Sequence, residues 1–184
     1  AENGGVYYPE ADAAPELLVD IPTVATHRHY LADLFQTLQE QVPKIQASTD
    51  NQFRITDWTF DVTGLSQETL ASLSRTCHNL GYGFTYSTVQ CHLFTMGQSK
   101  ATGLLQVLRR YFPDISPDQV LTVGDSPNDE SLFNPALFPH SVGVANLKDY
   151  RENLTYLPTY ITEAPEVDGF LELSQALLDG YHLS

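Results

Sequence analysis

Hydrophobic and polar residues follow two different rhythms along the chain, and the rhythm changes near residue 97. In the first part, apolar residues at helical spacing, such as Leu31, Leu34 and Leu38, lie between stretches that alternate as strands do. The pattern predicts, in order, a hairpin around ENGGVYY, a Pro- and Ala-rich connector over 9–22, a helix over 27–41, a strand in FRITDWTFDV, a helix over 67–80 and strands in GFTYSTVQCHLFTM. This order is typical of an α+β module with mostly antiparallel strands.

After Met96, helices and strands alternate. The pattern predicts a helix over 100–112, a strand over 120–123, a helix over 128–133, strands over 141–145 and 159–162, and a helix over 169–178. Such alternation predicts parallel strands joined by crossover helices, which is half of a doubly wound sheet.

Composition narrows the function classes. The chain has 184 residues, and 9 Lys and Arg against 23 Asp and Glu give it a formal net charge of -14. This charge repels phosphate backbones and anionic lipid, so we expect neither nucleic acid nor a membrane as partner. The two cysteines, Cys77 and Cys91, have no metal-ligand spacing and read as small core residues. With no signal peptide or membrane span visible, a cytoplasmic location is expected.

The segment VLTVGDSPNDESLF places Asp125 and Asp129 directly after a buried strand. In open α/β sheets ligands bind beyond the carboxyl ends of strands, which favours a functional site here. A purely structural interpretation is open as well. Ser126 would cap the next helix, Pro127 would occupy its first turn, and Asp129 would complete a capping box.

The segment GQSKATGLLQVLRRYF predicts a helix with Ser99 as N-cap and Lys100 at its first position. A lysine there opposes the helix dipole, at a cost of a few tenths to about 1 kcal/mol. Lys100 is therefore either an exposed side chain without a functional role or part of an anion-binding site together with the helix N-terminus. The expected core-facing stripe of this helix consists of Leu104, Leu105, Leu108, Tyr111 and Phe112.

Other polar residues are expected to have structural roles. We predict that the six histidines lie in the core or on the surface, because none pairs with another ligand at a suitable spacing. Asp50, Asp57 and Asp61 around the first strands are predicted to be loop and surface acids, and Arg109 and Arg110 to lie on a solvated face.

Taken together, SKATGLLQVL, VLTVGDSPNDESLF, SVGVANL and TYITEAPEVDGF resemble the third and fourth motifs and C-terminal tail of haloacid dehalogenase (HAD) superfamily phosphatases. The sugar-phosphatase type, which includes sucrose-phosphate and mannosyl-3-phosphoglycerate phosphatases, is the most similar. The resemblance implies an α/β fold in which residues 97–184 form the C-terminal half of a doubly wound, Rossmann-like HAD core. Residues 20–96 would be an inserted α+β cap domain, and residues 1–19 a core segment and connector into it.

The resemblance also implies roles for single residues. Asp125 would ligate Mg²⁺ directly, and Asp129 would support the metal through water or as an outer ligand. Lys100 would contact the transferring phosphoryl group. Asn128 would donate a hydrogen bond to a phosphate oxygen, and Ser126 would shape the same phosphate-binding loop. The implied substrate is a sugar phosphate or a similar small phosphorylated metabolite.

In one respect the sequence departs from the family. The family nucleophile is the first Asp of a DxD motif on an N-terminal strand, and the nearest string here, FDVTG with Asp61, lacks the second carboxylate. We therefore expect an N-terminally shortened member without turnover of its own. The edge of its strand over 120–123 would be covered by a retained fragment, by a second copy in a homodimer or by a rearranged strand. The alternative is a non-catalytic HAD-like binding or interaction protein.

Overall fold

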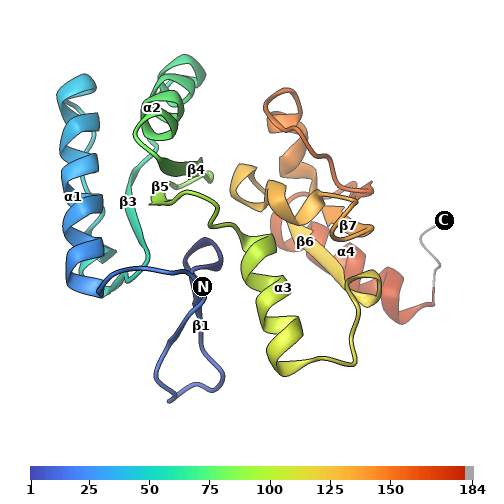
Figure 1. The fold of residues 1–184 in the computed structure, drawn as a ribbon. Helices are drawn as coiled ribbons and strands as arrows, with labels where there is room; N and C mark the ends of the chain where they lie inside the picture. Colours follow the sequence, from blue (N-terminus) through green and yellow to red (C-terminus); the bar gives the residue numbers. More distant parts are fainter. Residues whose placement is uncertain (181–184) are drawn as a thin grey trace. The chain divides into compact units, whose positions relative to one another are not determined.

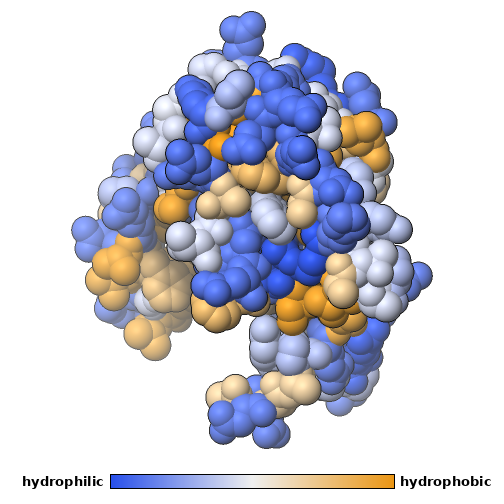
Figure 2. Space-filling model, turned by 90° about the vertical axis from the view of Figure 1, so that its left-hand side faces the viewer, coloured by the Kyte–Doolittle hydropathy of each residue, from blue (hydrophilic) through white to orange (hydrophobic). Residues whose placement is uncertain are grey.

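The computed structural model describes residues 1–180, which form two compact units, Ala1–Arg110 and the chain from Tyr111 onward (Figure 1). Each unit contains a three-stranded sheet of its own. The boundary lies at the end of helix α3 (Lys100–Tyr111). The face of the molecule on which α1 lies is mostly hydrophilic, with separate small apolar patches (Figure 2). No helix among the described residues is long and apolar enough to cross a membrane.

The N-terminal segment differs from the predicted hairpin. The turn at Asn3 and Gly4 belongs to a short 3-10 helix, η1 (Glu2–Gly4), and the strand pairing joins β1 (Val6–Tyr7) to β2 (Glu16–Leu17). Positive φ angles of 52° at Asn3 and 84° at Gly4 bend the chain before β1 begins. The predicted connector therefore contributes a strand, and the hairpin loop lies within it.

The rest of the first unit confirms the α+β prediction. Strands β3 (Asp57–Asp61), β5 (Gln90–Thr95) and β4 (Tyr82–Tyr86) form an antiparallel sheet in that order, with helices α1 (Val24–Gln41) and α2 (Gln67–Asn79). A short 3-10 helix, η2 (Thr49–Phe53), precedes β3. Helix α1 begins three residues before the predicted start, because Thr23 caps it by accepting a 3.1 Å hydrogen bond from the Thr26 amide.

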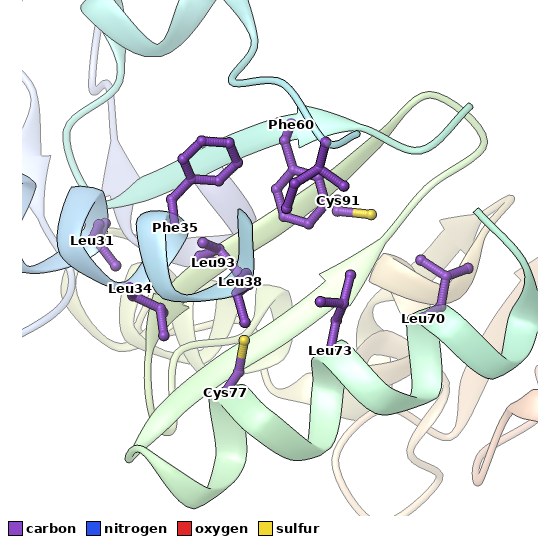
Figure 3. Packing of buried hydrophobic residues seen from close by; sticks show 11 residues of the cluster. Leu31, Leu34, Phe35, Leu38, Phe60, Leu70, Leu73, Cys77, Cys91 and Leu93 are labelled. Carbon is purple, nitrogen blue, oxygen red and sulfur yellow. The ribbon is translucent and has the colours of Figure 1, made fainter. Parts of the chain in front are cut away.

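Helices α1 and α2 pack on one face of this sheet (Figure 3). Alternate residues of β3 and β5 point into the core, which consists of Leu31, Leu34, Phe35, Leu38, Ile45, Phe60, Leu70, Leu73, Cys77, Cys91 and Leu93. Both cysteines are fully buried, which confirms them as small core residues. The residues between these core positions point to the opposite face of the sheet.

The second unit confirms the parallel sheet. Strands β6 (Leu121–Gly124), β7 (His140–Gly143) and β8 (Tyr160–Ile161) pair in that order, all parallel. Helix α4 (Glu166–Leu178) and three 3-10 helices complete the unit: η3 (Pro117–Gln119), η4 (Pro127–Phe133) and η5 (Ala145–Asn153). Among residues 1–180, β6 is an edge strand of its sheet.

The predicted core-facing stripe of helix α3 is confirmed only in part, since Leu108 is buried and Leu104 and Leu105 are half-buried. Tyr111 and Phe112 are exposed, and the buried residues are Ala101, Gly103 and Leu108. A Cβ added at Gly103 would lie 2.6 Å from the Cα of Gly4, so this helix packs closely on the η1 turn through its small residues. The apolar spacing alone could not show that the closest contact is made by a glycine.

Candidate active site

The loop after β6 contains four of the predicted site residues. Asp129 is 5% exposed and packs against the end of β6. A Cβ added at Gly124 would lie 2.3 Å from the Asp129 Cβ. Only glycine at 124 therefore lets the Asp129 side chain occupy this place. Asp129 Oδ2 accepts a 2.9 Å hydrogen bond from the backbone amide of Asp125, which fixes the two carboxylates in one loop.

The predicted capping box does not form. Ser126 is the N-cap of η4 by backbone geometry, but its side chain makes no capping bond. Its Oγ lies 3.0 Å from Asp125 Oδ1 and 2.9 Å from Asn128 Oδ1 instead. The polar side chains of this loop bind one another, so the stability role that a capping box would give Ser126 and Asp129 is excluded.

Lys100 lies in the other unit, at the start of α3. Ser99 is the predicted N-cap, and its Oγ accepts a 3.1 Å hydrogen bond from the Thr102 amide. Gly4 packs on the same turn, since a Cβ there would lie 2.0 Å from the Ser99 carbonyl oxygen and 3.1 Å from the Lys100 Cα. The structure thus brings the ENGG and GQSK segments into contact. That Lys100 and Asp125 belong to one site stays a prediction.

The loop after β6 offers oxygen ligands of the kind that Mg²⁺ prefers. Among residues 1–180, no three His, Cys, Asp or Glu side chains come together in a way that could hold a metal ion. Mg²⁺ is commonly held by one or two carboxylates, with water and substrate phosphate completing the octahedron. The pair of Asp125 and Asp129, brought together by Gly124, fits such a partial site.

Sequence reasoning missed a second polar cluster, and its prediction for Asp57 was wrong. Asp57 is fully buried, and its carboxylate accepts hydrogen bonds from Arg54 Nη1 at 2.9 and 3.1 Å and from Asn3 Nδ2 at 3.2 Å. His92 Nδ1 lies 3.0 Å from the same carboxylate. Burial by itself would raise the pKa of Asp57, but the His92 hydrogen bond and the Arg54 charge outweigh it and leave this pKa lowered.

Asp50 and Asp61 fit the sequence prediction better. Asp50 is partly exposed and forms an ion pair with Arg54, with 2.8 Å between Oδ2 and Nη2. Asp61 lies at the exposed end of β3, and its Oδ1 accepts a 2.7 Å hydrogen bond from the Thr63 amide. Asp57 differs from these two because it lies three residues after Arg54, and the Arg54 guanidinium binds its buried carboxylate.

A comparison with models of protein families shows the family to which the chain belongs. The model of the haloacid dehalogenase-like hydrolases matches residues 3–172, nearly the whole sequence. The chain belongs to this family. The predicted family is confirmed, and with it the α/β fold class.

Several solved structures share the fold of this chain. A protein of Thermoplasma acidophilum is 18% identical, with a TM-score of 0.68 over 96% of this chain and 70% of its own. The protein SMU.1108c of Streptococcus mutans is 16% identical, with a TM-score of 0.68 over 97% and 75%. The sucrose-phosphatase of Synechocystis sp. PCC6803, solved with sucrose and phosphate, is 17% identical, with a TM-score of 0.54 over 82% and 65%. No curated protein in the comparison matches the chain.

Proposed function

We propose that this hydrolase cleaves the phosphomonoester of a sugar or a similar small phosphorylated metabolite, with Mg²⁺ as cofactor. The observation that carries the proposal is the pairing of Asp125 and Asp129 at the end of β6, made possible by Gly124. Membership of the HAD-like hydrolases supports it, and the fold shared with a sucrose-phosphatase favours a sugar phosphate over other esters.

The loop residues have distinct roles in this proposal. Asp125 and Asp129 would hold Mg²⁺, which when bound lowers the charge repulsion between a phosphate and an attacking anion. Asn128 would donate a hydrogen bond to a phosphate oxygen, and Ser126 would keep the Asn128 and Asp125 side chains in place. Lys100 would neutralise further charge on the transferring phosphoryl group.

The nucleophile in this proposal is a carboxylate on a strand that precedes Ala1 in the full protein. It attacks phosphorus and forms an aspartyl-phosphate while the alcohol leaves with a proton from a neighbouring acid, and water then hydrolyses the acyl phosphate. The open edge of β6 offers a place for such a strand, because this edge pairs with no other strand among the described residues.

The test is phosphate release by the purified protein with its upstream coding segment included. The panel contains glucose 6-phosphate, mannose 6-phosphate, sucrose 6-phosphate and p-nitrophenyl phosphate, each with Mg²⁺ and with excess EDTA. We expect Mg²⁺-dependent release from at least one sugar phosphate, and no release by residues 1–184 alone. Phosphate binding without hydrolysis of any ester would instead identify a non-catalytic binding protein, and activity of residues 1–184 alone would show that the nucleophile lies within them.

A further inference from the structure

The antiparallel sheet of the first unit has two outer edges, and the edge formed by β3 is covered by side chains of the same unit. The Thr59 amide donates a 2.9 Å hydrogen bond to Asn51 Oδ1, and the Thr59 carbonyl accepts one of 2.7 Å from Asn51 Nδ2. The Asp57 amide donates to Glu2 Oε2 at 3.3 Å, and the Asp57 carbonyl accepts from Arg28 Nη1. The backbone groups that point outward from β3 at these two residues are therefore satisfied.

The edge formed by β4 has no such cover. The turn that joins β4 to β5 closes with a 2.8 Å hydrogen bond from the Ser87 amide to the Gln90 carbonyl. Hydrogen-bonded pairs occur at every second position of an antiparallel ladder, so the backbone groups of Tyr82 and Phe84 point away from β5. The amides and carbonyls of these two residues have no hydrogen-bond partner among residues 1–180. β4 is therefore a template for a further strand.

β4 also lacks the features that usually protect an edge strand. Its five residues, Tyr82–Tyr86, pair with β5 without a bulge and include no proline and no charged side chain. By contrast, β3 begins and ends with an aspartate. In a chain with a formal net charge of -14, two copies of β4 can pair without bringing carboxylates of the paired strands face to face.

The order of residues in β4 suits a second copy of the same strand. The sequence Tyr-Gly-Phe-Thr-Tyr has an aromatic residue at both ends and in the middle. Two antiparallel copies centred on Phe84 would place Phe84 opposite itself and Tyr82 opposite the partner's Tyr86. Aromatic residues directly opposite each other on one face of a sheet are favourable cross-strand pairs. The pairing is the same from either copy, as a two-fold interface requires.

Two exposed apolar side chains flank β4. Leu80, the C-cap of α2 just before the strand, is 52% exposed, and Val89, in the turn just after it, is 66% exposed. Antiparallel pairing brings the start of one β4 beside the end of the other. Leu80 of each copy would then lie at the same end of the interface as the partner's Val89. Their burial would add apolar area to an interface that one pair of short strands alone makes small.

We propose that β4 binds β4 of a second copy, in antiparallel register about Phe84, and so joins the two three-stranded sheets into one continuous sheet. The Phe84 amide of each copy donates a hydrogen bond to the Phe84 carbonyl of the other. This interface lies within the first unit, apart from the edge of β6, and it does not depend on the proposed phosphatase function.

The test measures self-association of the intact protein by sedimentation velocity over a range of protein concentrations. The wild type should show a monomer–dimer equilibrium. Tyr82→Lys places a charge without a partner at two symmetric positions of the interface, so the dimer dissociation constant should rise by roughly tenfold or more. Thr85→Lys is the matched control, because this side chain points to the opposite face of the sheet, and it should leave the association unchanged.

A cysteine on the two-fold axis tests the register, and it decides the question if Tyr82→Lys does not fold. Residues of a hydrogen-bonded pair have Cα atoms about 5.5 Å apart, a distance that a disulfide can bridge. Phe84→Cys should therefore form a disulfide between two copies under mild oxidation. Thr85→Cys should not, because it lies opposite the partner's Gly83. The natural cysteines, Cys77 and Cys91, are buried in the core.

A dimer that Tyr82→Lys weakens and that forms the disulfide only from position 84 supports the pairing. A wild type that stays monomeric at every concentration would overturn it, as would the absence of a disulfide from Phe84→Cys. A dimer that Tyr82→Lys leaves unchanged, or that forms disulfides equally from both introduced cysteines, would show that the two copies meet at another surface and would also refute the inference.

Discussion

The two sheets of this molecule place their polar residues differently. In the parallel sheet, Asp125 and Asp129 follow the end of β6, outside the strand itself. In the antiparallel sheet, Asp57 and His92 lie within β3 and β5, at positions that alternate with the apolar core. A polar residue after a parallel strand stands out in the sequence, whereas one on the open face of an antiparallel strand looks like an ordinary solvated position.

This difference explains why one site could be predicted and the other could not. The loop after β6 is local, so Gly124, Asp125 and Asp129 appear together in the sequence. The contact between Asp57 and His92 joins residues 35 positions apart and depends on the strand register. The following four predictions test how the polar and buried groups of the two units are placed.

The largest effect is expected from Asp57→Ala. Removing one partner of a buried ion pair leaves the other charge uncompensated and costs about 3–5 kcal/mol, so the free energy of unfolding should fall by that amount. The folded-state pKa of Asp57 is lowered, so its stabilisation is present above the unfolded value of about 3.9 and is lost as the pH falls through the lower folded pKa. Urea unfolding at pH 7, 5 and 3 should show the difference from the wild type shrinking only below about pH 4. Asp61→Ala, on the exposed end of the same strand, is the control and should leave the free energy of unfolding close to that of the wild type.

The next largest effect should come from Asp125→Asn in the parallel sheet. The change keeps the side-chain volume but removes a charge from the proposed metal site, so Mg²⁺-dependent turnover of the intact protein should fall by more than about 100-fold. The melting temperature of the Asp125→Asn variant should change little. The control variant, Asp61→Asn, should keep the turnover of the wild type. Wild-type turnover by Asp125→Asn would remove this residue from the site.

Two glycine substitutions probe one close contact in each unit. Gly124→Ala forces a Cβ to within 2.3 Å of that of Asp129, and Gly103→Ala forces one to within 2.6 Å of the Gly4 Cα. Overpacking of this kind costs about 1–3 kcal/mol, measurable by chemical denaturation. We expect Gly124→Ala to lower the apparent Mg²⁺ affinity as well, because it displaces Asp129. Unchanged stability in either variant would contradict the packing described for that unit.

The smallest effect concerns the two cysteines in the core of the first unit. Burial raises the pKa of Cys77 and of Cys91 to about 12, so very little reactive thiolate exists at pH 8. Neither thiol should react with iodoacetamide in the folded protein, whereas both should be alkylated in urea. Mass spectrometry of the two samples distinguishes these outcomes, and rapid alkylation without urea would show that α1 and α2 open readily.

By itself, the sequence determined the features that depend on neighbours along the chain. Helical and strand periodicities located α1, α2, β3 and the alternation around β6, because burial of one face imposes those periods. The position of Asp125 at the strand end and the capping of helix α3 by Ser99 also depend only on neighbours along the chain.

The tertiary structure alone decided which distant groups meet. It put Gly103 of α3 against Gly4, because only residues without a side chain allow that approach, and it left Tyr111 and Phe112 exposed at the end of the helix. It also buried Asp57, because Arg54, Asn3 and His92 converge on one carboxylate and together offset its desolvation. Local propensity and hydrophobic periodicity do not describe contacts between residues far apart in the chain. For this reason the sequence predicted a surface aspartate at position 57, whereas the structure buries it at the centre of a hydrogen-bonded network.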